Sequence, residues 1–234
     1  MRSIHYKSNN VYLGMASFES FLDDALYFLE VPDFVFIGRG VPHHENINVK
    51  YCQENNIPMV RSVVYGRSYL FEAGKNLYVC LISREQTAES KLQEILIDAL
   101  GNIGIKANIR VNDILFKERQ LGMTSTPIKT DGGYFVGGQI TFDADFDKVE
   151  RSLIMPDDKW VDKAPATNIR EWILPLSKIS KTTIDEFVEV VKKSTSKILG
   201  VSIENGQFTK EELTEMTLRK KDYASEDWLV KGTH

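Results

Sequence analysis

Residues Phe34 to Ile82 read FVFIGRGVPHHENINVKYCQENNIPMVRSVVYGRSYLFEAGKNLYVCLI, and this stretch decides the fold. An apolar, β-rich run is followed by a short polar helix and then by a second strand, which leads into a glycine-containing turn. Functional side chains often lie at strand ends, and guanidinium groups suit carboxylates and phosphates. The stretch therefore predicts a site for an anionic or acyl ligand, with the candidate residues Arg61, Gly66, Arg67 and Asn76.

Composition and charge are those of an ordinary globular protein. The 234 residues are 42% hydrophobic and 26% charged, which suffices for a substantial core. The formal net charge is -4 and the isoelectric point is about 5.7. The chain thus lacks the overall positive field that gathers nucleic acid or an anionic membrane surface, and we expect neither as a partner.

The two cysteines and the apolar segments bear on the cellular compartment. Two cysteines are too few for a disulfide scaffold or a cysteine-rich zinc site. Cys80 lies in an apolar run and Cys52 has no basic neighbour to lower its pKa, so neither is a candidate nucleophile. The first residues lack the core of a signal peptide, and no run of about 18 apolar residues occurs. We expect a cytoplasmic location.

Apolar periodicity and capping residues predict a mixture of helices and strands. Apolar residues recur at helical spacing after Ser17, so a helix is expected from Ser17 to a point before Pro32. Residues Glu118 to Gly133 are expected to form a loop, and a loop of that length is usually functional or mobile. The other expected elements are strands at 34–38, 59–65, 77–83, 107–116 and 134–142, and helices at 47–55 and from Ser90, Thr183 and Thr209.

The order of these elements predicts the domain organisation. We find no internal repeat and no linker rich in proline or glycine. The chain is therefore expected to form one domain over residues 1–234, with 181–234 as a C-terminal helical segment packed on it. Strands and helices in mixed order indicate an α+β fold class.

Several short motifs follow one another along the chain in a fixed order. V-x-I-G-R is followed by N-x-x-Y, by an arginine at the end of the next strand, and later by N-D-I. This order resembles that of the lipoate-protein ligase and octanoyltransferase family and covers nearly the whole chain. The resemblance implies a mixed β-sheet flanked by helices, as in the biotin/lipoate protein ligase (class II synthetase-like) fold. The matching residues are Met15, Ala16, Glu19, Val35, Ile37, Gly38, Arg39, Asn48, Tyr51, Arg61, Asn112, Asp113, Ile114, Gly138, Ile140, Asp145 and the tail KDYASEDWLVKG.

The glycine-rich motif of that family is altered in this chain. The family motif R-R-S-G-G-G-[AT]-V-x-H-D-x-G-N is matched at Gly66 and Asn76, whereas Arg67 and Ser68 occupy glycine positions and Glu72 occupies that of the histidine. Glycine lets a backbone approach a ligand closely. An arginine there either crowds the loop or brings a guanidinium to a phosphate or carboxylate, and both alternatives stay open. A surface salt bridge is the alternative role for Arg61 and Arg67.

The lysine that resembling proteins use against the acyl-phosphate charge is also replaced. The corresponding position holds Gln120, whose neutral amide supplies no charge. Lys129 or Lys75 would supply a cation if the loops folded inward. Residues 118–133 contain no cysteine for a thiol route, and the pair His43-His44 has no further ligands at metal-site spacing, so we expect no metal ligands in the chain.

The resemblance implies a function for the site. We expect binding of a lipoyl or medium-chain acyl group, such as lipoate or octanoate, and its transfer to, or recognition on, a lysine of a lipoyl-type carrier domain. ATP and Mg²⁺ would serve the ligase route, and an accessory protein chain is a further expected partner. The alternatives are a noncatalytic binding or regulatory partner of the carrier and an enzyme that adenylates biotin. The candidate residues are Gln120 and Lys129 for catalysis and Arg61, Gly66, Arg67, Asn76, Asn112, Asp113, Gly122 and Gly138 for ligand binding.

Overall fold

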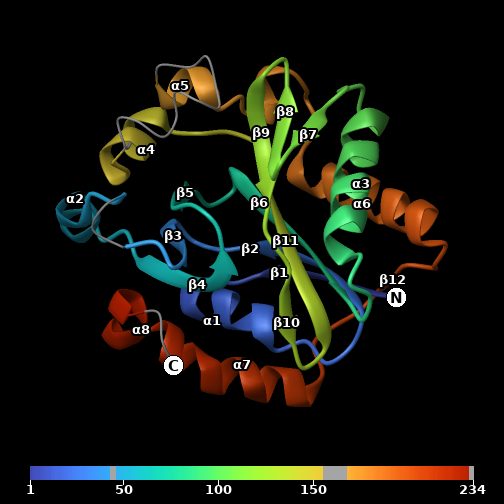
Figure 1. The fold of residues 1–234 in the computed structure, drawn as a ribbon, viewed down its shortest axis with the longest axis horizontal. Helices are drawn as coiled ribbons and strands as arrows, with labels where there is room; N and C mark the ends of the chain where they lie inside the picture. Colours follow the sequence, from blue (N-terminus) through green and yellow to red (C-terminus); the bar gives the residue numbers. More distant parts are fainter. Residues whose placement is uncertain (43–45, 155–167, 232–234) are drawn as a thin grey trace.

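A mixed β-sheet runs through the computed structural model, which describes residues 1–42, 46–154 and 168–231 (Figure 1). The strand β1 pairs in parallel with both of its neighbours, and the remaining pairs of the sheet are antiparallel. Along the sheet the strands are β12 (Glu204–Asn205), β1 (Arg2–Lys7), β2 (Ala25–Glu30), β6 (Asn76–Ser83), β11 (Gly133–Thr141), β9 (Arg119–Thr124), β8 (Asp113–Phe116) and β7 (Asn108–Arg110), with β10 (Ile128–Thr130) paired to β11.

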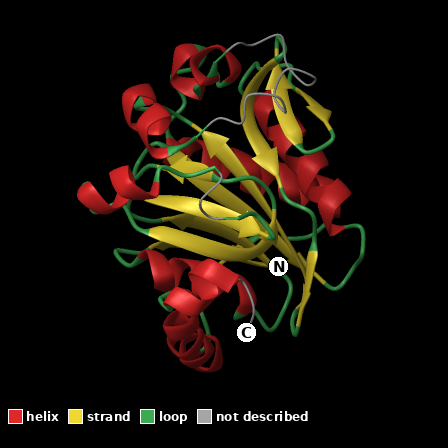
Figure 2. Cartoon of the chain, turned by 60° about the vertical axis from the view of Figure 1, so that its left-hand side comes forward, coloured by secondary structure: helices red, strands yellow, loops and turns green. Residues whose placement is uncertain are grey.

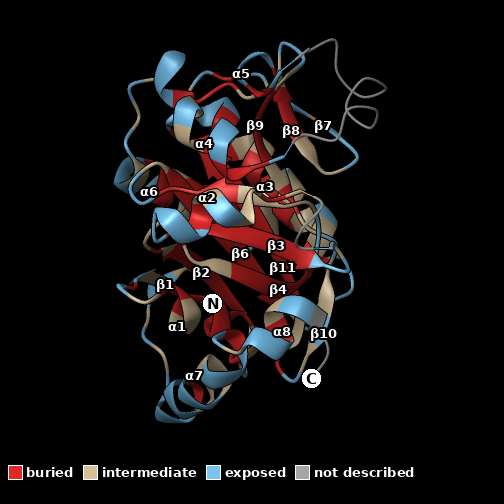
Figure 3. Cartoon of the chain, turned by 90° about the vertical axis from the view of Figure 1, so that its left-hand side faces the viewer, coloured by how far each residue is buried: buried red, intermediate tan, exposed pale blue. Residues whose placement is uncertain are grey.

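A second, smaller sheet is built by the stretch that opened the sequence analysis. The strand β3 (Phe34–Arg39) lies between β4 (Met59–Tyr65), which is parallel to it, and β5 (Tyr69–Phe71), which is antiparallel. The parallel pair is joined through α2 (Val49–Glu54), as parallel strands need a crossover connection. Buried residues are concentrated on the strands of both sheets (Figure 3).

Helices cover both sheets (Figure 2). Besides α2, the helices are α1 (Val11–Ala16), η1 (Ser17–Glu19), α3 (Ala88–Asn102), α4 (Phe146–Ser152), α5 (Ile169–Trp172), η2 (Leu176–Lys178), α6 (Ile184–Leu199), α7 (Lys210–Tyr223) and α8 (Glu226–Lys231). One apolar cluster joins the large sheet to α3 and α6. A second lies between the two sheets and includes residues of α1, α7 and α8, and a third joins the small sheet to α2, α4 and α5.

The last part of the chain returns to the start of the sheet. A capping box at Thr183 begins α6, and Gly200, in the left-handed conformation, ends it. A second capping box at Thr209 begins α7, where the buried carboxylate of Glu212 accepts a hydrogen bond of 2.8 Å from Arg2 of β1. Residues 181–234 therefore contribute a short strand as well as helices.

Two expectations about secondary structure are wrong. The helix expected from Ser17 is limited to the three residues of η1, and residues Ala25–Glu30 form strand β2, because a short run that is buried on both faces fits a central strand as well as a helix. Residues 118–133 are not a loop but contain β9 and β10. The turn before β9 places Lys117 and Glu118 at positive φ without the asparagine or glycine that commonly marks such a turn.

Most other elements are confirmed. The strands from Phe34, Met59 and Asn76 are present, as are the helices of α2, α3, α6 and α7, and the α+β fold class is confirmed. The strand expected at 107–116 is a hairpin of β7 and β8 that turns at Val111, which has a φ of 58°. The pair His43-His44 lies outside the described residues. Among the described residues, no helix has both the length and the apolar composition needed to cross a bilayer.

We predict that Gly38→Ala destabilises the fold through a backbone clash. A Cβ atom at Gly38 would lie 2.0 Å from the carbonyl oxygen of Gly66, so the end of β3 and the turn after β4 would have to separate. Urea unfolding should show a loss of about 1–3 kcal/mol or more. The control Gly101→Ala meets open space in α3 and should raise the stability by roughly 0.5–1 kcal/mol. Equal stabilities of Gly38→Ala and the unmodified protein would contradict the close approach.

Candidate functional site

A cavity of about 370 Å³ opens between the small sheet, strands β9 and β11, and helices α4 and α5. One wall is aliphatic and the floor is polar, which suits a ligand with one apolar and one polar end. The lining residues are Val41, Asn46, Gly66, Arg67, Ser68, Tyr69, Leu70, Glu72, Asn76, Gln120, Met123, Gln139, Thr141, Ala144, Val149, Leu153, Ile154, Ile169 and Ile173.

Amide and hydroxyl groups form the floor of this cavity. The side-chain oxygen of Asn76 accepts a hydrogen bond of 2.7 Å from the backbone N–H of Glu72, which fixes the turn between β5 and β6. Gln139 donates a hydrogen bond of 2.9 Å to the hydroxyl of Thr141. All these residues are buried. The hydrogen bonds hold them in fixed orientations beside the cavity.

Glu72 brings a carboxylate to the cavity, and Lys75 neutralises it. The ammonium of Lys75 lies 2.9 Å from Oε1 of Glu72, and the backbone N–H of Asp145 donates to Oε2 at 3.0 Å. Burial lowers the pKa of Lys75, but the hydrogen bond to Glu72 raises it, and the net shift is upward. Lys75 is therefore charged and engaged by Glu72 at neutral pH.

Gln120 lines the cavity from strand β9. Its amide Nε2 donates a hydrogen bond of 2.6 Å to Oδ1 of Asp113, and its side chain is 5% exposed. The neighbouring Arg119 donates to the backbone carbonyls of Glu171 and Ile173, at 2.8 and 2.7 Å, and so fixes the end of α5 against β9. Gln120 is thus an uncharged, hydrogen-bonded group on a well-supported strand.

Arg61 lies behind the cavity and is not among the lining residues. It is 3% exposed, and its guanidinium donates to the carbonyls of Leu229, Gly38 and Val41 at 2.9, 3.2 and 2.8 Å. Its own carbonyl accepts a hydrogen bond of 2.8 Å from the indole of Trp228. These contacts join α8 to the chain segment that supplies Val41 to the cavity.

The structure brings four of the predicted site residues together and places the others elsewhere. Gly66, Arg67, Asn76 and Gln120 line the cavity. Lys129 is exposed and pairs with Tyr134 of β11. The cavity residue Gln139 lies five residues further along β11, so Lys129 is roughly 17 Å from the cavity at about 3.4 Å per residue. Gly122 is packed against the backbone of Gln139. Asn112 and Asp113 line a neighbouring cavity of about 340 Å³, and Gly138 lines one of about 40 Å³. Gly66, Arg67 and Met123 line all three cavities.

Gln139 and Thr141 are cavity residues that the sequence analysis did not single out. They alternate along β11 with apolar neighbours, so both side chains face the same side of the sheet. That spacing of two polar residues in an apolar strand was the available signal. The aliphatic wall from α4 and α5 had no comparable signal, because apolar residues of short helices are usually core.

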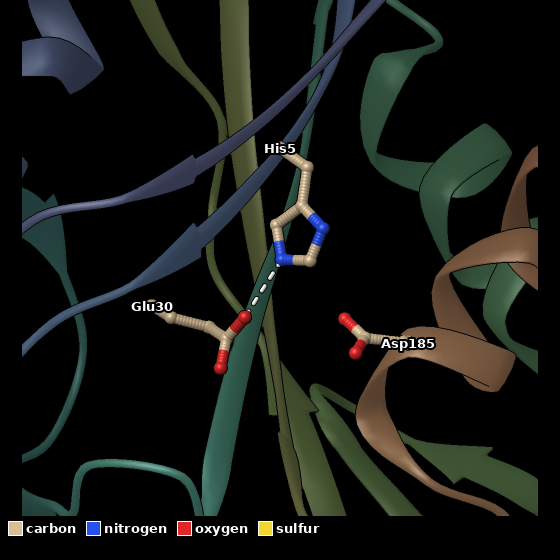
Figure 4. A group of neighbouring side chains, drawn as sticks. All are labelled: His5, Glu30 and Asp185. Atoms are coloured by element: carbon tan, nitrogen blue, oxygen red, sulfur yellow. Dashed lines mark hydrogen bonds and ion pairs between the residues drawn. The ribbon is translucent and has the colours of Figure 1, made fainter.

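A second group of titratable side chains lies on the other side of the molecule, where β1 and β2 meet α6 (Figure 4). His5 Nε2 lies 2.7 Å from Oε1 of Glu30, and the ammonium of Lys7 lies 3.0 Å from Glu30 and 3.3 Å from Asp185. The hydrogen bonds from His5 and Lys7 lower the pKa of Glu30. Because Lys7 already supplies the cation between the carboxylates, we assign no metal ion to this group.

Comparison with known sequences identifies similar proteins. The model of the lipoyl protein ligase A/B catalytic domain matches residues 11–196. The lipoate-protein ligase LplJ of Bacillus subtilis (strain 168) is 28% identical over 169 residues, which cover 69% of this chain and 50% of the relative. The chain therefore spans about half the length of that relative.

Comparison with solved structures supports the same fold. A bi-partite lipoate protein ligase of Thermoplasma acidophilum, described together with its E2 lipoyl domain, has a TM-score of 0.86 and 20% identity over 100% of this chain and 97% of that one. A second structure from T. acidophilum, with bound lipoic acid, has a TM-score of 0.85 at 16% identity and covers 100% and 99%. Lipoate-protein ligase A bound with ATP has a TM-score of 0.85 at 17% identity and covers 98% of each chain. At these identities the likeness establishes the fold, and the expected class II synthetase-like fold is confirmed.

We predict that Arg61→Ala costs stability because the carbonyls of Leu229 and Val41 lose the hydrogen bonds from the guanidinium, whereas the carbonyl of Gly38 keeps the backbone N–H of Val41. Buried carbonyls without a partner are expensive, and the loss of unfolding free energy should be about 2–4 kcal/mol. The control Arg67→Ala, at the half-buried cavity mouth, should change stability by less than about 1 kcal/mol. Chemical denaturation of the two variants measures both values. Similar, small losses in both variants would contradict the structural role of Arg61.

Proposed function

The chain belongs to the lipoyl protein ligase A/B catalytic domain family, and on that premise we propose that it binds a lipoyl or medium-chain acyl group by its carboxyl end. The acyl group is then transferred to, or recognised on, a lysine of a lipoyl-type carrier domain. One observation carries this proposal: Gly66, Arg67, Asn76 and Gln120, which come from three separate parts of the chain, line a single cavity with a polar floor and an aliphatic wall.

Two residues at the mouth of the cavity, Arg67 and Ser68, support an orientation in which the carboxyl group of the ligand lies at the mouth. Arg67 is the one cation among the described lining residues, and a guanidinium matches a carboxylate in a planar, two-bond geometry. The hydroxyl oxygen of Ser68 is buried beside it without a hydrogen-bond partner. A carboxyl oxygen of the ligand would satisfy this hydroxyl. We therefore propose that the carboxyl end lies at Arg67 and Ser68.

The same cavity has surfaces that could hold a nucleotide in the ligase route. ATP with Mg²⁺ would supply the chemical activation of the carboxyl group, and the related ligase A is known with bound ATP. The aliphatic wall formed by Val149, Leu153 and Ile169 offers a surface for the flat base of a nucleotide. The carboxylates near the site are already engaged, because Asp113 accepts from Gln120 and Glu72 from Lys75. We therefore assign Asn112, Asp113 and Gln120 to the wall that faces the carboxyl end, and no residue to Mg²⁺.

The partner follows from the comparison with the archaeal protein. The bi-partite lipoate protein ligase of T. acidophilum is described with its E2 lipoyl domain. A lipoyl-type carrier domain is the corresponding partner proposed here, and a second protein chain is proposed to assist it, since "bi-partite" describes that relative. We also propose a cytoplasmic location and one domain over residues 1–234.

A noncatalytic role is the second candidate, and one contact favours it. The amide of Gln120 is hydrogen-bonded to Asp113 where the resembling family carries a lysine. Lys75 is paired with Glu72, and Lys129 lies roughly 17 Å along the sheet. The cavity then retains the groups that hold an acyl chain, but among the described lining residues no lysine faces it. Such a protein would bind the acylated carrier without modifying it.

A carrier acylation experiment separates the two candidates. The protein is incubated with ATP, Mg²⁺, lipoate or octanoate and several lipoyl-type domains, and also with acylated domains as donors. Mass spectrometry should show the acyl mass on a carrier lysine if the protein is an enzyme. Binding of the acylated carrier with no mass change for any donor would exclude the enzyme and support the noncatalytic role. Competition with biotin in the binding experiment tests the biotin alternative.

We predict that Gln120→Lys increases ATP-dependent acyl transfer. The lysine would pair with Asp113 and place a positive charge on the cavity wall, and one preorganised group of this kind is commonly worth about 10²- to 10³-fold in turnover. The control Gln120→Leu removes the hydrogen bond without adding charge and should give no increase. Unchanged transfer in Gln120→Lys, with ligand binding intact, would show that the position does not face the carboxyl end.

A further inference from the structure

Tyr69, the first residue of β5, separates two neighbouring cavities. Its ring is stacked on Phe36, with the centroids 4.7 Å apart and the planes inclined by 21°. Its hydroxyl is hydrogen-bonded to the hydroxyl of Tyr78 on β6. The ring is therefore held in place from its face and from its end.

Beyond Tyr69 lies a small cavity that is almost entirely apolar. Its volume is about 40 Å³, and aromatic rings close it, with Phe18 and Phe135 packed at a centroid distance of 4.8 Å. A water-sized group needs roughly 10–15 Å³ on this scale, so the cavity holds about three such groups. The hydrocarbon part of an octanoyl or lipoyl group is larger than that.

The two cavities share one boundary. Five residues line both of them: Gly66, Arg67, Tyr69, Met123 and Gln139. A ligand whose carboxyl group lies at Arg67 would direct its tail across this boundary, where Tyr69 stands. In the motif that this segment resembles, the position of Tyr69 is held by alanine or threonine. The large aromatic side chain at this position is thus a feature of the present chain and not of the motif.

We propose that Tyr69 sets the length of the acyl chain, so that the site prefers carboxylic acids with a hydrocarbon part shorter than that of octanoate. This inference rests on the proposed function and assigns the substrate class of the same site. The tail enters the boundary between the cavities and stops against the ring, which Tyr78 and Phe36 hold in position. Tyr69 is a specificity-determining residue, whereas Tyr78 is a positioning residue.

The free energy of burying each methylene is large enough for this chain-length limit to be measured as a difference in affinity. Each methylene that the protein buries strengthens binding by about fourfold. Affinity should therefore rise from butyrate to hexanoate and then fall for octanoate and lipoate, because the longer tails would have to displace a half-buried aromatic ring that Phe36 and Tyr78 hold in position. A tail that instead lay along the aliphatic wall of the larger cavity would meet no such limit.

The test compares butyrate, hexanoate, octanoate and lipoate by calorimetry and ligand-observed NMR. The unmodified protein should bind hexanoate at least tenfold more tightly than octanoate. Tyr69→Thr removes the ring and retains a residue suited to a strand, and should reverse that order. The matched control Tyr69→Phe keeps the ring and should keep the original order. If Tyr69→Thr folds poorly because Tyr78 loses its partner, Tyr69→Thr/Tyr78→Phe removes the orphaned hydroxyl and should show the same reversal.

Three results would overturn the inference. Tighter binding of octanoate or lipoate than of hexanoate by the unmodified protein would show that the ring is no barrier. An unchanged order in folded Tyr69→Thr would place the tail along the aliphatic wall. Both results would leave the proposed acyl site standing. Absence of binding by every acid to every variant would instead remove the proposed function together with the inference.

Discussion

The close approach of two backbone segments, at Gly38 and Gly66, is the constraint on which the site depends. There is no room for a side chain at Gly38, because the carbonyl of Gly66 occupies that space. Below this contact, Arg61 binds the carbonyls of Gly38 and Val41 and thereby fixes the chain that leaves β3. The mouth of the larger cavity is built on this contact, since Val41, Gly66 and Arg67 all line it.

Binding an acyl group and activating it would need different charged groups around the cavity. Binding needs a cation or donors at the carboxyl end and an apolar surface for the tail, and Arg67, Ser68 and the aliphatic wall meet both needs. Activation would also need positive charge where negative charge develops. Gln120 gives a hydrogen bond there but no charge, and Lys75 is committed to Glu72. These charges favour the proposed binding of an acyl group over its activation.

The sequence predicted β3, β4, β6 and β11, because each of them is a clear apolar run bounded by glycine, proline or polar residues, but it did not predict the three-residue strand β5. It failed at Ala25–Glu30, where a run buried on both faces has no period of its own, and at β9, where the preceding turn lacks asparagine and glycine. The cavity residues Gly66, Arg67, Asn76 and Gln120 were suggested by motif order. The positions of Arg61 and Lys129 depend on long-range pairing and hydrogen bonds that no local pattern reveals.

In the site that we propose, one cavity receives the carboxyl end of an acyl group at Arg67 and Ser68. The most direct measurement is a crystal structure of the protein with hexanoate at saturating concentration. We predict that the carboxylate lies within hydrogen-bond distance of Arg67 and Ser68 and that the tail points toward Tyr69. Hexanoate bound only outside this cavity, or bound in it with the carboxylate against the aliphatic wall, would contradict the account.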